Sequence, residues 1–202
     1  HVTKEGNVAG PRTLEHLVDV VLYLEGERYH GTRILRGIKN RFGAVDEIGV
    51  FEMSEKGLVE GNPSKLFLDQ RQTSVPGSVI TATIEGTRPF LVEIQALTTP
   101  TNFGYPKRTA AGFDLNRLNL LIAVLTKRAG INLSNHDVYL NVSGGYKLKD
   151  PGADLAVCLA IASVMKNKPI DKKICLFGEV GLSGEIRKVA YEKKRKEEAK
   201  RM

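Results

Sequence analysis

Residues 150–164 read DPGADLAVCLAIASV, and the fold of the second half of the chain is built around this stretch. Small and apolar residues follow Asp154 up to Val164, which predicts a helix over about 154–164. Downstream, the apolar run Ile174–Phe177 predicts a buried strand. Cys158 and Cys175 lie inside these two apolar runs and are predicted to be buried thiols. Residues 191–201 predict a highly charged terminal helix, supported by pairs such as Glu192 with Lys196.

The segment before this stretch predicts a second helix and another strand. Asp114 is a good N-cap residue, and Gly130 suits the position just past a helix C-terminus. Apolar residues recur between them at helical spacing, namely Leu115, Leu118, Leu121, Ile122 and Leu125. Residues 137–142 predict a strand. Further upstream, alternating residues 78–84 and 90–97 flank the turn 85–88 and predict a β-hairpin. The polar residues 98–112 predict a long loop, which in a compact domain is usually functional or mobile.

The first half of the chain is rich in strands. The nearly continuous apolar run 17–24 suits a strand buried on both faces, and residues 32–39 and 48–53 predict two more strands. Ser54–Gly57 predicts a hairpin turn in which Gly57 adopts a positive φ, and residues 62–64 predict a helix start. Standing alone, these strands would expose sheet edges, which indicates a fragment whose sheet is completed by preceding residues. The polar stretch 69–77 predicts a domain boundary.

Composition limits the classes of protein that fit. The 202 residues contain only two cysteines and no Cys/His cluster typical of a metal site, which favours a reducing, cytoplasmic compartment. No apolar run reaches the ~18 residues that a membrane span needs. The net charge of +7 is uneven: residues 1–100 hold 11 Lys and Arg against 13 Asp and Glu, and the remainder holds 19 against 10. A basic half favours a polyanionic partner such as nucleic acid, but from charge alone a solvated basic surface with a lysine-rich terminal helix is the better explanation.

The pentapeptide Lys39-Asn40-Arg41-Phe42-Gly43 follows a predicted strand and ends in glycine. Its two cations can reach phosphate oxygens, Arg41 as a fork and Lys39 as a point charge. At a boundary between subunits, they could stabilise charge on the γ-phosphoryl group bound by a neighbour. An exposed basic turn is the alternative. The chain contains no G-x-x-x-x-G-K-[ST] phosphate loop, so this segment is not expected to hydrolyse ATP alone.

KNRFG resembles the signature of the RadA/Sms family of bacterial DNA recombination and repair proteins. Flanking segments agree in order along the whole chain: VTKEG, AGPR, EIGVFEM, PGSV, EGTRP, LVEIQAL, ADLAV and FGEVGL. The resemblance implies a partial RecA-like segment over 1–72 and, over 73–202, a Lon-protease-like domain of ribosomal-protein-S5-like type, truncated at its C-terminus. The expected fold class is therefore α/β, or α+β.

The resemblance also implies a function for the full-length protein. It would be a DNA-dependent ATPase and helicase that processes and branch-migrates recombination intermediates, using ATP and Mg²⁺. Its expected partners are single-stranded and branched DNA, a RecA-type recombinase and further copies of itself in a homo-hexamer. Lys39 and Arg41 would sense ATP in trans. Lys4 and Arg12 lie where RecA-like motors place a loop facing the DNA channel, and they could neutralise phosphates.

Residues 150–193 resemble the Lon protease domain, which uses a serine nucleophile within P-S-A-G and a lysine base some forty residues later. The matching stretch here starts at Pro151, and Gly152 occupies the serine position. Lys193 falls near the expected lysine but sits among other charged residues, so it is predicted to be a surface lysine. Neither Ser143 nor Ser163 is in the motif position. Proteolysis, which needs a nucleophile beside a base, is therefore not expected.

Three roles stay open for the Lon-like domain. In the first, it is a hexamer scaffold and DNA platform, with Lys107, Arg108, Lys147 and Lys149 as candidate contacts to the DNA backbone. In the second, the protein is an ATP-dependent Lon-type serine peptidase. In the third, the domain only oligomerises, and its basic loops are an ordinary solvated surface.

Overall fold

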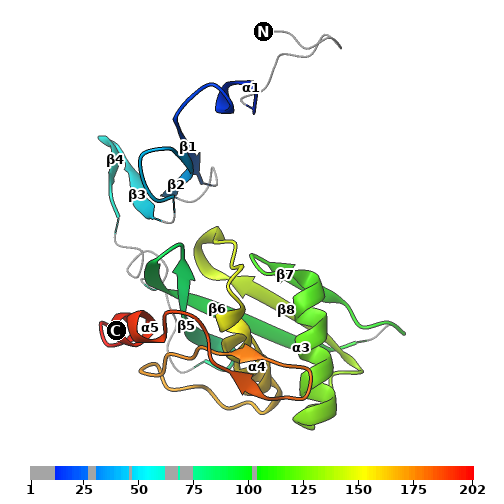
Figure 1. Ribbon diagram of the computed structural model, residues 1–202. Helices are drawn as coiled ribbons and strands as arrows, with labels where there is room; N and C mark the ends of the chain where they lie inside the picture. Colours follow the sequence, from blue (N-terminus) through cyan, green and yellow to red (C-terminus); the bar gives the residue numbers. More distant parts are fainter. Residues whose placement is uncertain (1–11, 27–30, 46, 62–67, 69–74, 102–103) are drawn as a thin grey trace. The chain divides into compact units, whose positions relative to one another are not determined.

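The computed structural model describes residues 12–26, 31–45, 47–61, 68, 75–101 and 104–202 (Figure 1). The chain divides into two compact units, one comprising His1–Gly61 with Glu85–Arg88 and the other comprising Asn62–Ile84 with Pro89–Met202. The helix start predicted at residues 62–64 lies outside the described residues, as does most of the boundary predicted at 69–77.

The first unit contains a short helix and a four-stranded antiparallel sheet. The elements are α1 (Arg12–Glu15), β1 (Val20–Glu25), β2 (Thr32–Asn40), β3 (Ile48–Ser54) and β4 (Gly57–Glu60), and the sheet order follows the sequence. The strands predicted at 32–39 and 48–53 are confirmed. The predicted hairpin turn is also confirmed, because Gly57 has a φ of +102° and joins β3 to β4.

The burial predicted for residues 17–24 is wrong. Strand β1 forms, but five of its six residues are exposed, and Leu22 keeps 59% of its surface accessible. Its position explains this, because β1 is an edge strand that pairs with β2 on one side only among the described residues. An apolar run shows that a strand is able to be buried. Whether it is buried depends on whether other elements pack against the strand.

The second unit is built on a four-stranded sheet in the order β5-β6-β8-β7 (Figure 1). Strands β6 and β8 are antiparallel, and β7 runs parallel to β8. The main elements are β5 (Ser78–Glu85), β6 (Arg88–Pro100), β7 (Arg108–Ala111), α3 (Leu115–Arg128), β8 (His136–Val142) and α4 (Asp154–Met165). After them come β9 (Glu179–Val180), β10 (Ile186–Arg187) and α5 (Glu192–Ala199).

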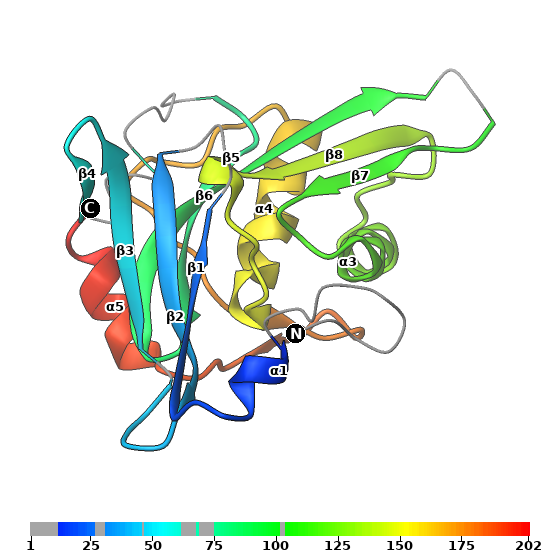
Figure 2. The ribbon, with the colours of Figure 1, turned by 90° about the horizontal axis from the view of Figure 1, so that it is seen from above.

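Helices α3 and α4 cover the same face of this sheet (Figure 2). Residues Ile94 of β6 and Val142 of β8 are paired in register and buried beneath them. The helices contribute Leu118 and Ile161, both with no accessible surface. The predicted helix signals are confirmed, because Asp114 accepts a hydrogen bond from the Arg117 backbone N–H and Gly130 follows α3 with a φ of +67°.

Two predictions for this unit need correction. Residues 98–112 are not one long loop, because β6 continues to Pro100 and residues 108–111 form β7. The four-residue β7 has no hydrophobic alternation of its own, and pairing with β8 makes it a strand. The stretch Ile174–Phe177 is not a buried strand: it makes a single bridge, between Cys175 and Ile80, and Cys175 is half-buried.

The predicted terminal helix is confirmed as α5, with one unexpected feature. Lys193 is exposed, as predicted, but Arg195 and Glu198 on the same helix are buried. Hence α5 turns a charged face toward its own domain. Among the described residues, no helix is both long and apolar enough to cross a membrane.

The core between the sheet and α3 gives a first test of the fold. We expect Leu118→Ala to lower the free energy of unfolding by about 2–5 kcal/mol, because it leaves a cavity at a fully buried site. Urea denaturation measures this. Leu120→Ala, on the same helix at a side chain 45% exposed, is the control and should cost far less. Equal losses for both variants would contradict the packing described for α3.

Candidate functional site

Lys39 and Arg41 lie at the end of β2, the strand-to-loop junction that the sequence predicts. The Lys39 ammonium donates to the backbone carbonyl of Glu15 at 2.8 Å. The Arg41 guanidinium pairs with Asp19 at 3.0 Å, and both side chains are largely exposed. An exposed pair of this kind contributes little to stability, so Arg41 can exchange Asp19 for another anion at small cost.

The remaining predicted basic residues fall into different settings. Lys4 lies outside the described residues, and so does the side chain of Arg12, which begins α1. Lys107 is exposed next to β7. Arg108 donates to the backbone carbonyls of Leu133, at 2.8 Å, and His136, so its N–H groups hold the start of β7 against the turn before β8. Burial lowers the pKa of Arg108, and the negative charge of Asp137 acts in the other direction, to raise it.

Lys147 and Lys149 lie on the loop that connects β8 to α4. Both side chains are exposed, and none of the contacts described for this loop engages either ammonium group. The residues between and before them point inward: Leu148 and Tyr146 are buried. Tyr146 packs edge-on against Phe90, with ring centroids 5.0 Å apart. The Leu148 backbone N–H donates to the Gly112 carbonyl at 2.7 Å.

Asp150 ends this loop in a buried ion pair with Arg195 of α5. The guanidinium donates to the carboxylate at 2.6 and 3.1 Å, and Arg195 is only 2% exposed. The same carboxylate accepts from the Thr83 hydroxyl and from the backbone N–H groups of Ile84 and Gly152. Burial acts to raise the pKa of Asp150, but hydrogen bonds from Arg195 and Gly152 outweigh it and lower the pKa.

Arg195 also fills the space beside Gly152, the residue predicted to stand in the serine position of Lon-type proteases. A Cβ on Gly152 would lie 2.8 Å from an Nη atom of Arg195, closer than such atoms approach. The exposed Lys193 is not directed to this place by any contact that the structure shows. The other serines are engaged elsewhere, Ser143 with Glu93 at 3.0 Å and Ser163 with the Lys168 carbonyl. Among the described residues, neither of these serines is paired with a lysine side chain, and Gly152 itself has no hydroxyl.

A second buried ion pair holds the other side of the α4 N-terminus. Asp154 has no accessible surface and accepts from Arg117 of α3, with the Nε at 3.0 Å, and from the Val180 backbone N–H. The hydrogen bond to Asp154 raises the pKa of Arg117. One helical turn further on, burial and the nearby Asp154 charge raise the pKa of the Cys158 thiol to about 12, which keeps it protonated and unreactive.

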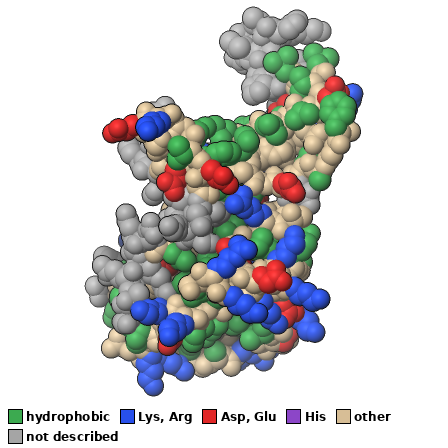
Figure 3. Space-filling model, turned by 90° about the vertical axis from the view of Figure 1, so that its left-hand side faces the viewer, with side chains coloured by type: hydrophobic (Ala, Val, Ile, Leu, Met, Phe, Trp, Pro, Cys, Tyr) green, Lys and Arg blue, Asp and Glu red, His purple; other side chains and the backbone are tan. Residues whose placement is uncertain are grey.

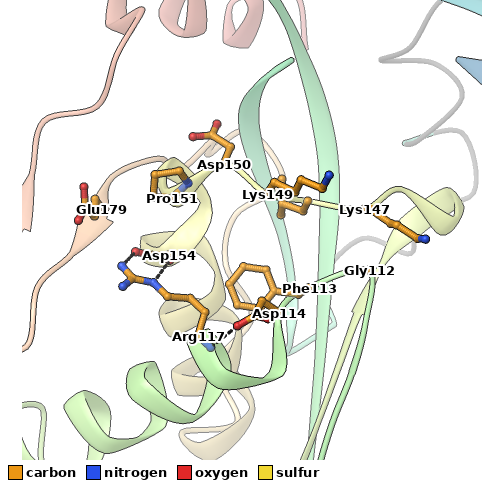
Figure 4. A pocket seen from close by; sticks show the side chains of 11 residues that line it. Gly112, Phe113, Asp114, Arg117, Lys147, Lys149, Asp150, Pro151, Asp154 and Glu179 are labelled. Atoms are coloured by element: carbon orange, nitrogen blue, oxygen red, sulfur yellow. Dashed lines mark hydrogen bonds and ion pairs between the residues drawn. The ribbon is translucent and has the colours of Figure 1, made fainter. Parts of the chain in front are cut away.

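A cleft of about 730 Å³ opens between the loop and the start of α3 (Figure 4). Its walls include Phe113, Lys147 and Lys149, and Arg117 and Asp154 also line it. Glu179 stands on the opposite side of the cleft from the two lysines (Figure 4). Within the described part of the chain, no group of three or more metal-ligating side chains comes together.

The sequence indicates the basic loop and the glycine, but not the residues that organise them. Arg195 is a single arginine in a run of lysines and glutamates, and its burial depends on Asp150, which is distant in sequence. Arg117 and Asp154 are likewise drawn together only by the packing of α3 on α4. No local signal marks Arg195, because the Lon resemblance directs attention to Lys193, two residues earlier.

The sequence of this chain is similar to those of known proteins. Residues 122–202 match the Lon protease (S16) C-terminal proteolytic domain. This part of the second unit is therefore similar to the Lon C-terminal proteolytic domain.

The whole chain is 56% identical to the DNA repair protein RadA of Bacillus subtilis, 57% identical to that of Streptococcus pneumoniae and 55% identical to that of Listeria monocytogenes. The chain is thus a homologue of DNA repair protein RadA that carries a Lon C-terminal-like domain. It is covered completely in these comparisons but spans only 44–48% of the length of these relatives.

The contact between Gly152 and Arg195 predicts that a restored serine does not restore a peptidase. We expect Gly152→Ser to lower the free energy of unfolding by about 1–3 kcal/mol, because the new side chain displaces Arg195. Urea denaturation and a fluorogenic casein assay measure stability and proteolysis. Gly104→Ser, at a glycine with open space around it, is the control and should be close to neutral. Casein turnover by Gly152→Ser would contradict this account of the site.

The Asp150–Arg195 pair predicts a pH-dependent contribution to stability. Asp150→Asn should cost about 3–5 kcal/mol at neutral pH, because it leaves the buried guanidinium uncompensated. The folded pKa of Asp150 lies below its unfolded value of about 3.9. The contribution is therefore present above about pH 4 and is lost as the pH falls through the folded pKa. Denaturation between pH 3 and about pH 7 should show the difference from wild type narrowing at the acidic end.

Asp171→Asn is the matched control for this experiment. Asp171 is an exposed aspartate whose side chain accepts a hydrogen bond from the Lys173 backbone, a bond that asparagine can keep. It should remain near wild type throughout. A constant difference between Asp150→Asn and wild type across this pH range would refute the ionic character of the pair.

Proposed function

We propose that this chain is the C-terminal part of a DNA-dependent ATPase and helicase that acts in homologous recombination and repair, processing and branch-migrating recombination intermediates. The observation that carries the proposal is the similarity to RadA proteins along the entire chain. Residues 1–72 then belong to a RecA-like core, and residues 73–202 form the Lon-like domain. The protein acts in the cytoplasm, together with a RecA-type recombinase.

In this proposal the Lon-like domain is a scaffold for a homo-hexamer and not a protease. The support is chemical: Gly152 has no nucleophile, and Arg195 takes the adjacent space while paired with Asp150. A guanidinium remains charged in proteins and cannot act as the neutral base that a serine peptidase needs. The retained fold therefore serves assembly and DNA contact.

The proposed contact with the DNA backbone centres on Lys147 and Lys149. They are exposed on a loop whose neighbouring residues are buried, so two positive charges are presented together without a competing carboxylate bonded to either. Lys107 is a further candidate, whereas Arg108 contributes by holding β7 in place. Lys and Arg side chains also gather on one face of the second unit (Figure 3). Lys4 and Arg12 are proposed to face DNA in the motor channel.

Lys39 and Arg41 are proposed to sense ATP bound, with Mg²⁺, by a neighbouring subunit. Their position at the end of β2 suits this role because a strand end is a fixed point from which a cation can reach a phosphate. The partners that they have within the unit, a carbonyl and an exposed carboxylate, are weak enough to be exchanged.

DNA binding by the loop is tested with paired lysine variants. Lys147→Ala/Lys149→Ala should weaken binding to duplex DNA and reduce the slope of log affinity against log salt by about 2, since each lost phosphate contact removes ~0.9. Fluorescence anisotropy over a range of salt concentrations measures both. Lys166→Ala/Lys168→Ala is the control, because these exposed lysines have the same spacing and charge. If the two pairs behave alike, DNA contact is not localised to the loop.

Nucleotide sensing is tested in the full-length protein. Lys39→Ala or Arg41→Ala should uncouple ATP hydrolysis from DNA movement while leaving the fold intact, as measured by ATPase and strand-unwinding assays. Asp19→Asn, which removes only the local partner of Arg41, is expected to retain coupling. Wild-type unwinding by both cation variants would rule out the sensing role.

A further inference from the structure

The loop from Tyr146 to Asp150 is held by alternate residues. Tyr146, Leu148 and Asp150 point into the domain, and Lys147 and Lys149 between them point to solvent. Tyr146 is fixed by its contact with Phe90, and Leu148 by its hydrogen bond to Gly112 and by burial. Tyr146 is held by a ring contact and Leu148 by burial and a backbone hydrogen bond, so neither brings a charge into the domain.

Asp150 differs from the other two anchors because it carries a charge into a buried position. Its side chain is only 10% exposed, and a carboxylate at such a place would turn outward to water unless a cation met it. Arg195 is that cation. It is itself held by the backbone carbonyls of Ala82, at 2.6 Å, and Ala190, at 3.0 Å, so contacts besides the one with Asp150 fix its guanidinium.

We infer that Arg195 is a positioning residue for DNA binding: through Asp150 it fixes the loop so that Lys147 and Lys149 are presented together to the DNA backbone. This inference rests on the proposed DNA contact of the two lysines. Arg195 is only 2% exposed and is bonded to Asp150, so it acts through Asp150 and not through direct contact with DNA. If Asp150 lost its bond to Arg195, the backbone at the neighbouring Lys149 could move. The position of Lys147 relative to Lys149 would then no longer be fixed.

The test is a double-mutant cycle on the whole chain, with a fluorescein-labelled DNA duplex as the probe. Arg195→Lys keeps the charge but loses the two-pronged bond, and it is less disruptive than removal of the side chain. It should weaken binding and reduce its salt dependence, by no more than Lys147→Ala/Lys149→Ala does. Added to that double variant, Arg195→Lys should cause no further loss. Lys193→Ala, on the exposed side of α5, should leave binding near wild type.

Hydrogen exchange supplies an independent measurement without DNA. The Leu148 amide, bonded to the Gly112 carbonyl, should exchange faster in Arg195→Lys, whereas the amides of α3 should keep their protection. Unchanged protection at Leu148 would overturn the inference, as would an equal loss of DNA affinity in both backgrounds, which would indicate general destabilisation.

The remaining outcomes separate the inference from the proposed function. If the lysine variants weaken binding but Arg195→Lys does not, Arg195 has no positioning role, and the DNA contact stands. If Lys147→Ala/Lys149→Ala itself leaves binding unchanged, the proposed contact fails, and the positioning role fails with it.

Discussion

The second unit depends on one buried ion pair, between Asp150 and Arg195. Asp150 closes the loop after β8, and Arg195 comes from the last helix, so the pair joins the end of the chain to the domain's centre. Together with Arg117 and Asp154, it places an arginine from α5 and one from α3 on two carboxylates at the start of α4. Negative charge at a helix N-terminus is favourable, and each carboxylate here is also neutralised by a guanidinium. The two ion pairs thereby connect α3 and α5 to the residues at the start of α4.

Local patterns were sufficient to predict helices α3 and α4. The cap at Asp114, the apolar spacing of α3 and the run after Asp154 act within a few residues, so the sequence reveals them directly. Pairing across the chain is a different matter: β7 exists because β8 lies beside it, and β1 is exposed because no described layer covers it. Arg195 was missed for the same reason, since its charge suggests solvent until Asp150 is known to lie opposite.

For the candidate site, sequence alone located the charges but not their partners. Lys147 and Lys149 are exposed, as their loop position predicts, whereas Arg108 turns its donors onto backbone carbonyls. Composition cannot separate these cases because all three residues are basic and lie on predicted loops. The separation comes from the backbone carbonyls of Leu133 and His136, which accept hydrogen bonds from the planar guanidinium of Arg108. A basic residue is therefore a candidate for DNA contact only if its donors are not already bonded within the domain.

The fit of Arg195 against Gly152 has a consequence for how such a domain changes over generations. A serine at 152 meets an occupied site, and a lysine at 195 would keep a charge beside Asp150 but lose the two-pronged bond. Neither step helps without the other, and each alone harms the fold. Any path of single substitutions from this arrangement to a serine–base pair would thus pass through a destabilised variant.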